Sequence, residues 1–209
     1  MRLTMVLVAA LGLAGVCFEG EEAKAEEGWI PLFDGKSLDG WKASEAPDSF
    51  KVEDGVIVVQ AKPRSHLFYD GPVKDHNFHN FELKLEVMTF PGANSGVYFH
   101  TVFQQGGWPG KGYEAQVDNT HSDPKRTGSL YNVKNYMEVP AKDNEWWTYL
   151  ITYNNGKITT SVNGKLLVEY TEPENPGPSK PPSGTFCLQG HDPKSKVLFR
   201  NIRVKPLPD

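Results

Sequence analysis

The amino-acid sequence predicts an all-β fold, either an antiparallel sandwich of two sheets or a jelly roll. First, ten to twelve segments rich in β-branched and aromatic residues follow one another, with turn residues at short spacing. Second, Asn-Gly pairs at 155–156 and 163–164 separate such segments, and this pair is the strongest short-range signal of a hairpin. Third, no stretch of twelve residues places apolar side chains at helical spacing, so the helical crossovers of a parallel sheet are not predicted.

The first strands are predicted from turn residues and from alternation. Residues 29–41 contain two Asp-Gly turns between short apolar stretches, and residues 49–60 form a hairpin that bends at a third Asp-Gly pair. Segment 81–88 alternates clearly between apolar and charged residues. Its inward-facing set is predicted to be Phe81, Leu83, Leu85 and Val87, and its outward-facing set Glu82, Lys84 and Glu86.

The later strands surround the two Asn-Gly turns. Segments 146–153, 157–162 and 165–170 are predicted to pair in sequence order. Residues 171–184 contain five prolines and are expected to form an irregular surface loop. The last two strands are predicted within 186–191 and 196–204.

Residues 94–131 contain the side chains with the greatest chemical interest. Alternate side chains of a strand share a face. In the first half Val97 and Phe99 therefore face the core, and Tyr98 and His100 face the opposite side. In the second half the polar set, opposite three apolar residues, is Glu114, Gln116 and Asp118. This face offers an acid, an amide, a phenol and an imidazole without lysine or arginine, which is typical of a groove for a hydroxylated ligand.

Length and composition place the chain among globular proteins of one domain. It has 209 residues, of which 38% are hydrophobic and 23% charged. The formal net charge of -4 argues against a nucleic-acid partner, because phosphate binding requires a basic surface. After removal of the N-terminal segment one cysteine, Cys187, remains, so no internal disulfide is predicted.

Residues 1–25 are predicted to be an export signal and residues 26–209 the mature domain. A basic Arg2 precedes an apolar run, residues 5–18, that is too short to span a bilayer, and Ala23-Lys24-Ala25 supplies a cleavage pattern. Attachment of lipid at Cys17 is the alternative, and the bulky Val16 before it disfavours this. In both cases the protein is expected to be periplasmic or extracellular, without a transmembrane span.

Six segments together resemble the family of 3-keto-disaccharide hydrolase domains. They occur in the family's order and are spread over the mature chain: LFDGKSLDGW (32–41), NSGVYFH (94–100), GYEAQVDNTH (112–121), RTGSLY (126–131), EWWTY (145–149) and LQGHDPKSKVLFRNIRVKPL (188–207). The resemblance implies a concanavalin A-like jelly roll with a carbohydrate site on its concave sheet. It also implies a sugar 3-dehydrogenase that supplies the keto substrate.

The spacing of carboxylates disfavours ordinary glycosidase chemistry. Such enzymes hold two carboxyl groups about 5–5.5 Å apart for retention, or about 6.5–9.5 Å apart for inversion. Glu114 and Asp118 are four residues apart on one predicted strand, which corresponds to about 13 Å. Gln116 occupies the intermediate position.

A 3-keto sugar, which the resemblance implies, requires different groups. The ketone acidifies the hydrogen on C2, so the bond from C1 to the glycosidic oxygen can break by elimination, followed by addition of water. This needs one general base, a donor for the enolate oxygen and an acid for the leaving group. Glu114, His191 and His100 are the predicted catalytic residues. The predicted substrate-binding residues are Tyr98, Trp108, Gln116, Asp118, His121, Arg126, Tyr131 and Gln189.

Several alternatives remain open from the sequence. Glu114 on an exposed strand face is also compatible with a solvated side chain, and Trp108 with a cap over the core edge. Glu114 together with His100, His121 and His191 could converge on a divalent metal, but they show no spacing motif, so no cofactor is predicted. A non-catalytic carbohydrate-binding module is the alternative function, and a conventional glucanase is a weaker third hypothesis.

Overall fold

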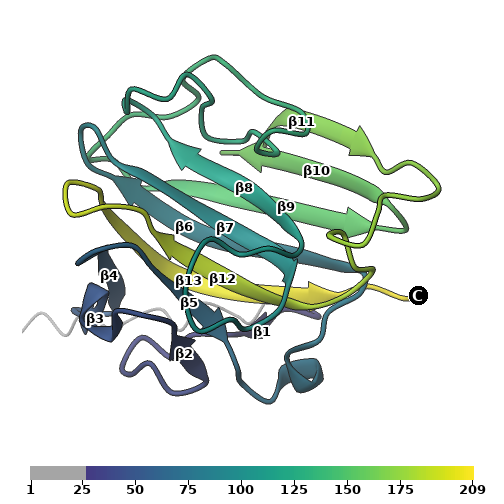
Figure 1. Cartoon of the computed structure of the whole chain (residues 1–209), viewed down its shortest axis with the longest axis horizontal. Helices are drawn as coiled ribbons and strands as arrows, with labels where there is room; N and C mark the ends of the chain where they lie inside the picture. The colour runs from purple at the N-terminus through teal and green to yellow at the C-terminus, as the bar shows by residue number, and fades with distance from the viewer. Residues whose placement is uncertain (1–26) are drawn as a thin grey trace, which may run out of the picture.

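Two antiparallel sheets pack face to face in the computed structural model, which describes residues 27–209 (Figure 1). This confirms the predicted fold class. The predicted export signal and Cys17 lie outside the described residues. Within 27–209 no helix has the length and apolar character needed to cross a membrane.

The larger sheet contains eight strands and the smaller sheet five. The larger sheet has the order β11 (Lys165–Thr171), β10 (Lys157–Val162), β9 (Trp147–Asn154), β6 (Phe81–Thr89), β13 (Lys196–Pro206), β4 (Val56–Gln60) and β3 (Phe50–Glu53), with β1 (Ile30–Pro31) paired to β13. The smaller sheet has the order β2 (Trp41–Ala43), β5 (Ser65–Tyr69), β12 (Thr185–Gly190), β7 (Asn94–Thr101) and β8 (Tyr113–Asp118). Two short 3-10 helices, Pro47–Ser49 and Val73–His76, lie in connections.

The predicted hairpins form at the predicted turns. Asn155 and Gly156 connect β9 to β10, and Asn163 and Gly164 connect β10 to β11. All four residues have positive φ, between 49° and 79°, as a two-residue hairpin turn with right-handed strand twist requires. The strand count exceeds the prediction because β1 and β2 contain only two and three residues, too few for an alternation pattern.

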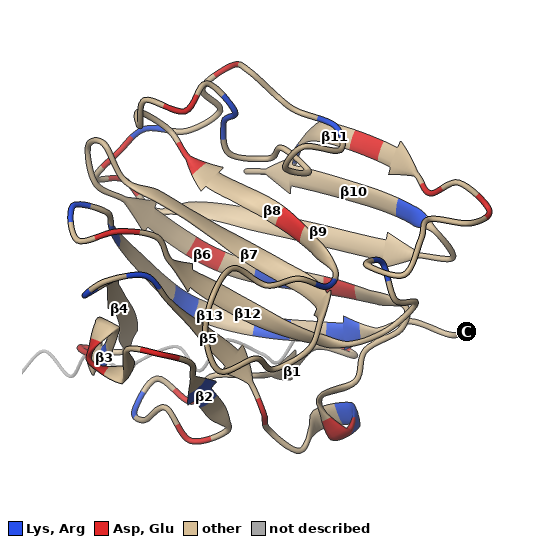
Figure 2. Cartoon of the chain, in the orientation of Figure 1, with Lys and Arg blue, Asp and Glu red and all other residues tan. Residues whose placement is uncertain are grey.

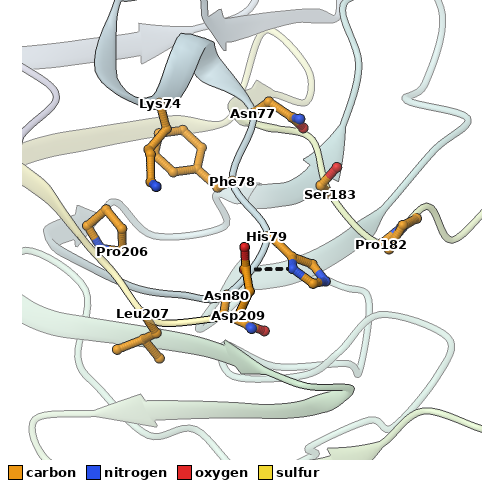
Figure 3. A pocket seen from close by; sticks show the side chains of 10 residues that line it. All are labelled: Lys74, Asn77, Phe78, His79, Asn80, Pro182, Ser183, Pro206, Leu207 and Asp209. Carbon is orange, nitrogen blue, oxygen red and sulfur yellow. Dashed lines mark hydrogen bonds and ion pairs between the residues drawn. The ribbon is translucent and has the colours of Figure 1, made fainter.

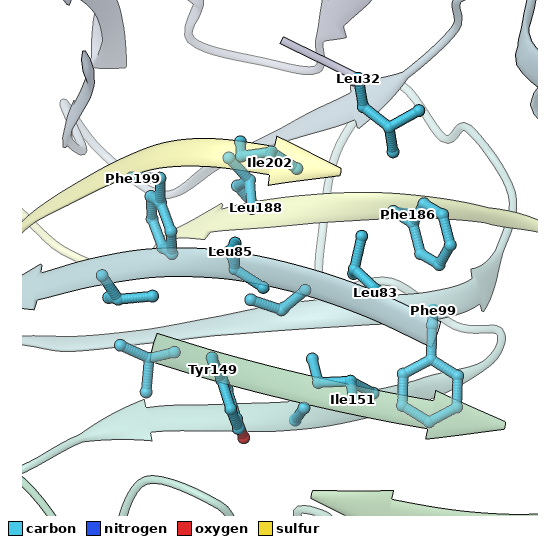
Figure 4. Packing of buried hydrophobic residues seen from close by; sticks show 14 of the residues in the cluster. Leu32, Leu83, Leu85, Phe99, Tyr149, Ile151, Phe186, Leu188, Phe199 and Ile202 are labelled. Atoms are coloured by element: carbon cyan, nitrogen blue, oxygen red, sulfur yellow. The ribbon is translucent and has the colours of Figure 1, made fainter. Parts of the chain in front are cut away.

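The core lies between the inward faces of the two sheets (Figure 4). Strand β6 contributes Leu83 and Leu85, which are 1% exposed, and the smaller sheet contributes Val97, Phe99 and Val117, which are fully buried. The inward residues therefore occupy the predicted positions. Because successive side chains of β7 and β8 point to opposite faces, Tyr98 and Glu114 belong to the outer face of the smaller sheet.

Candidate functional site

A cleft of about 450 Å³ lies over the outer face of the smaller sheet, beside the loop between β7 and β8. The structure brings seven of the predicted site residues to it, together with Asn94 and Pro109. The seven are Tyr98, Trp108, Glu114, Gln116, Tyr131, Gln189 and His191.

Strand register places Glu114 at the floor of the cleft. In the antiparallel pair β7–β8, Tyr98 lies opposite Glu114 and Gly96 lies opposite Gln116. A Cβ atom on Gly96 would stand 2.4 Å from Oε1 of Glu114, a distance that real side chains do not tolerate. The glycine therefore provides the space into which the Glu114 carboxyl group extends.

Two neighbours hold the Glu114 carboxyl group in one orientation. The Tyr98 hydroxyl donates to Oε2 at 2.9 Å, and Nε2 of Gln189 donates to Oε1 at 2.8 Å. Burial raises the pKa of Glu114 to about 7, although these two hydrogen bonds favour the ionised form. Glu114 is thus present in both protonation states near neutral pH, which suits a group that takes up and releases a proton.

His191 lies at the rim and is oriented by Asp192. Nδ1 of His191 is 2.9 Å from Oδ2 of Asp192. Partial burial would raise the pKa of Asp192, but hydrogen bonds from Ser195, His191 and the Lys194 backbone lower it to about 2. An ionised carboxylate only accepts, so Nδ1 carries the proton and Nε2 of His191 is left for the cleft.

Trp108 forms one wall of the cleft and is 46% exposed. Its indole ring lies 5.1 Å from the His191 ring and 5.7 Å from the His66 ring, measured between centroids. The guanidinium of Arg64 lies over the same indole at 4.8 Å, and Glu45 pairs with Arg64 at 2.9 Å. Trp108 is therefore positioned by three neighbours, His191, His66 and Arg64, and Glu45 holds Arg64.

His66 and Asn94 were missed by the sequence analysis. Burial lowers the pKa of His66 to about 4, and no hydrogen bond to its buried Nε2 occurs within the described residues. His66 lies beside Gln189 because β5 pairs with β12. Asn94 lies in the segment NSGVYFH and alternates with Gly96 and Tyr98, so strand alternation could have identified it. His66 is the second residue of β5, whose sequence SHLFY does not alternate between polar and apolar residues.

Asp118 and Arg126 bind each other and do not line the cleft, contrary to their predicted role. Asp118 is fully buried, and its Oδ1 accepts from Nη1 of Arg126 at 3.0 Å. The same Nη1 donates to the backbone oxygens of His121 and Asp123 at 2.8 and 2.7 Å. Arg126 thus fixes loop 118–127 from within. This loop also presents Asp123 to the hydroxyl of Tyr131, which donates to it at 2.8 Å.

His100 lies outside the cleft, so the predicted catalytic position for it is corrected. Its ring packs against Tyr153 and Phe81, with centroid distances of 4.2 and 5.7 Å, and its Nε2 lies 2.9 Å from the backbone oxygen of His79. Alternation predicts that His100 shares a face with Tyr98. It fails because His100 follows the last residue of β7 that pairs with β8, Phe99, and has a positive φ of 52°. Burial lowers the pKa of His100 to about 4.

Among the described residues that line the cleft, Glu114 is the one carboxylate. Strand β8 carries acidic residues and no basic ones (Figure 2), but its second acid, Asp118, is held by Arg126. His121 does not line the cleft but contacts two residues that do: its Nδ1 lies 3.4 Å from Nδ2 of Asn94, and its ring lies 5.8 Å from the His191 ring, measured between centroids. Across residues 27–209 no three His, Cys, Asp or Glu side chains gather closely enough to hold a metal ion.

A second cavity, of about 330 Å³, lies elsewhere in the molecule, between the segment 74–80 and the C-terminus (Figure 3). The His79 ring reaches Asp209 at its edge, with Nδ1 2.8 Å from Oδ1. None of the predicted site residues lines this cavity. The cleft over β7 and β8 is therefore the candidate site, because seven predicted residues line it and none lines the second cavity.

A known family and a curated protein resemble this chain in sequence. The model of the 3-keto-α-glucoside-1,2-lyase-like domain family matches residues 28–205. The 3-keto-disaccharide hydrolase of Bacteroides thetaiotaomicron is 26% identical over 171 residues, which cover 69% of this chain and 59% of that protein. The chain thus spans about three fifths of the length of this curated relative.

Solved structures show the same architecture. A crystal structure from Parabacteroides distasonis ATCC 8503, provisionally named a glycosyl hydrolase, aligns with a TM-score of 0.72 and 26% identity, covering 87% of this chain and 95% of that chain. The exoplasmic/lumenal domain of VIP36 aligns with a TM-score of 0.57 and 10% identity, covering 88% of this chain and 90% of that chain. At that identity the second likeness concerns the fold alone.

Proposed function

Because this chain belongs to the family of 3-keto-α-glucoside-1,2-lyase-like domains, we propose that it is an enzyme that cleaves 3-keto-glycosides in the cleft over β7 and β8. The observation that carries the proposal is the solitary carboxyl group of Glu114, whose pKa is about 7, in a cleft whose described lining has no second carboxylate. Elimination beside a ketone needs one such base, whereas an ordinary glycosidase needs a pair.

The proposed reaction has two stages. Glu114 takes the proton from C2, and the electrons of the C–H bond form an enolate that includes O3. The enolate then returns to a ketone, and its electrons form a double bond between C1 and C2. The bond from C1 to the glycosidic oxygen breaks, and the leaving oxygen receives a proton. Water then adds across the double bond, its hydroxyl to C1 and its hydrogen to C2, so the net change is hydrolysis.

The described neighbours suit these two stages. Tyr98 and Gln189 each donate a hydrogen bond to one carboxylate oxygen of Glu114, which fixes the orientation of the base relative to the substrate. Nε2 of His191, with its proton held on Nδ1 by Asp192, accepts a proton from water or, once protonated, gives one to the leaving oxygen. Trp108 offers an apolar face for a sugar ring.

The cellular setting is part of the same proposal. The apolar run and cleavage pattern of residues 1–25 support export to the periplasm or beyond. A 3-keto-glycoside arises by oxidation of a C3 hydroxyl group, so a sugar 3-dehydrogenase is the expected supplier of substrate. No cofactor of this chain is required by the two stages above.

The reaction is tested by incubating residues 26–209 with a 3-keto-disaccharide and with its unoxidised parent in D₂O, with and without EDTA. We expect sugar release from the keto compound alone, with one deuterium at C2 of the product, and the same rate with EDTA. Product incubated without enzyme controls for spontaneous exchange. Equal rates on the parent sugar would contradict the proposal, and release without deuterium would indicate direct hydrolysis.

The rate should depend on pH through Glu114. Because burial raises the pKa of Glu114 from 4.5 to about 7, the carboxylate needed as a base is scarce at pH 5 and predominant at pH 8. We therefore expect kcat/KM to rise with pH, with a midpoint near 7, measured from initial rates between pH 5 and 9. A rate that falls through the same midpoint would assign Glu114 the role of acid.

Carbohydrate binding without catalysis is the second candidate function. The observation that favours it is the half-exposed indole of Trp108, positioned by Arg64 and His191 beside a cleft lined with amides and hydroxyls. In that case affinity for an unoxidised disaccharide would persist without any turnover.

A further inference from the structure

Two residues that line the cleft have a side-chain amide oxygen with no hydrogen-bond donor within the described structure. The two oxygens are Oε1 of Gln116 and Oε1 of Gln189, and both are buried. The two side chains are 1% and 2% exposed, and both line the cleft. Buried polar atoms are normally paired, so each unpaired oxygen requires an explanation.

The orientation of the Gln189 amide follows from its neighbours. Its Nε2 donates to Oε1 of Glu114 at 2.8 Å and to the hydroxyl of Tyr98 at 3.2 Å. Rotation of the amide by 180° would place its carbonyl oxygen against the carboxylate of Glu114, and two acceptors repel each other. The oxygen of Gln189 is therefore the atom left without a partner.

The orientation of Gln116 follows from a chain of contacts that begins at a backbone N–H. The N–H of Asp123 donates to Nδ1 of His121 at 3.1 Å, so this nitrogen is an acceptor. Asn94 must then direct its NH₂ group to the same nitrogen, at 3.4 Å, and its oxygen toward Gln116. Nε2 of Gln116 accordingly donates to Oδ1 of Asn94 at 3.3 Å, which leaves Oε1 of Gln116 without a donor.

We infer that Gln116 and Gln189 determine specificity by accepting hydrogen bonds from two hydroxyl groups of a sugar. The inference rests on the proposed function only in that the cleft holds a carbohydrate. In the free protein both oxygens are already removed from water, so the free-energy cost of their desolvation is not added on binding. A hydroxyl group of the ligand that donates to either oxygen therefore stabilises the complex. A ketone oxygen only accepts, so the carbonyl group of a keto sugar would lie away from both amide oxygens.

Fluorine distinguishes this arrangement from other contacts, because it is close to a hydroxyl group in size but cannot donate. The binding of an unoxidised disaccharide, which the protein is not expected to cleave, and of its monodeoxy and deoxyfluoro derivatives is measured by calorimetry with the unmodified protein. At two ring positions we expect both replacements to weaken binding by about tenfold to a hundredfold, the fluoro compound no better than the deoxy compound. At other positions fluorine should be tolerated.

Variants assign each position to a residue. In Gln116→Met the penalty for loss of one hydroxyl group should disappear, and in Gln189→Met the penalty for the other, whereas a merely structural role would leave both penalties in place. The exposed Gln60 of β4 provides a control, Gln60→Met, in which both penalties should persist. Intact unfolding temperatures verify that the variants are folded.

The results separate this inference from the reaction. If every fluoro derivative binds as tightly as its parent, or if no sugar binds, the inference is wrong even where turnover of keto sugars by the unmodified protein is observed. If the two penalties appear and follow the two variants while no turnover is found, the inference stands and the proposed reaction is wrong.

Discussion

Replacement of Glu114 by glutamine is expected to lower the turnover of a 3-keto-disaccharide by about 10²- to 10⁴-fold, with affinity nearly unchanged. Glutamine is close to glutamate in shape and volume, and the Tyr98 hydroxyl can still donate to its amide oxygen. The amide cannot take a proton from C2. The measurement is a comparison of kcat for the variant and its parent, with Kd obtained separately by calorimetry.

An exposed acid supplies the matched control for this variant. Glu53 lies on β3 with about half of its side chain exposed and pairs with Lys51, so Glu53→Gln should leave kcat unchanged. A Glu114→Gln variant with at least half of the parent's turnover would exclude Glu114 as the base. Retained affinity without turnover in the parent protein as well would favour the carbohydrate-binding function.

Replacement of Arg126 by alanine is expected to lower the free energy of unfolding by about 3–5 kcal/mol. The change removes the donor shared by Asp118, His121 and Asp123, and it leaves the fully buried carboxylate of Asp118 without its cation. Chemical denaturation of the variant and its parent, analysed as two-state transitions, measures the difference.

A second substitution tests whether charge is the cause. Asp118→Asn introduced together with Arg126→Ala removes the uncompensated charge, so the double variant should recover part of the lost stability. Arg200→Ala is the control, because Arg200 pairs with the partly exposed Glu86 and its loss should cost about 1 kcal/mol or less. Unchanged stability of Arg126→Ala would show that the buried pair does not hold loop 118–127.

Several features of the fold and site could be predicted from the sequence because they depend on neighbouring residues. Alternation along residues 81–88 and 113–118 identifies which side chains share a face of the sheet, since the pleat of a strand alternates whatever its partner is. The Asn-Gly pairs determine two hairpins because both turn positions require positive φ. The same alternation placed Tyr98, Glu114 and Gln116 on one face.

The remaining features of the site depend on tertiary structure. His66 lies beside Gln189 only because β5 pairs with β12, which joins segments more than a hundred residues apart. His100 leaves the face of Tyr98 because its φ of 52° ends the alternation, and Arg126 binds Asp118 because loop 118–127 folds back on itself. Local pattern thus determined which face of β7 and β8 is polar, whereas strand pairing and loop closure decided which polar groups meet there, because those contacts join residues that sequence spacing does not relate.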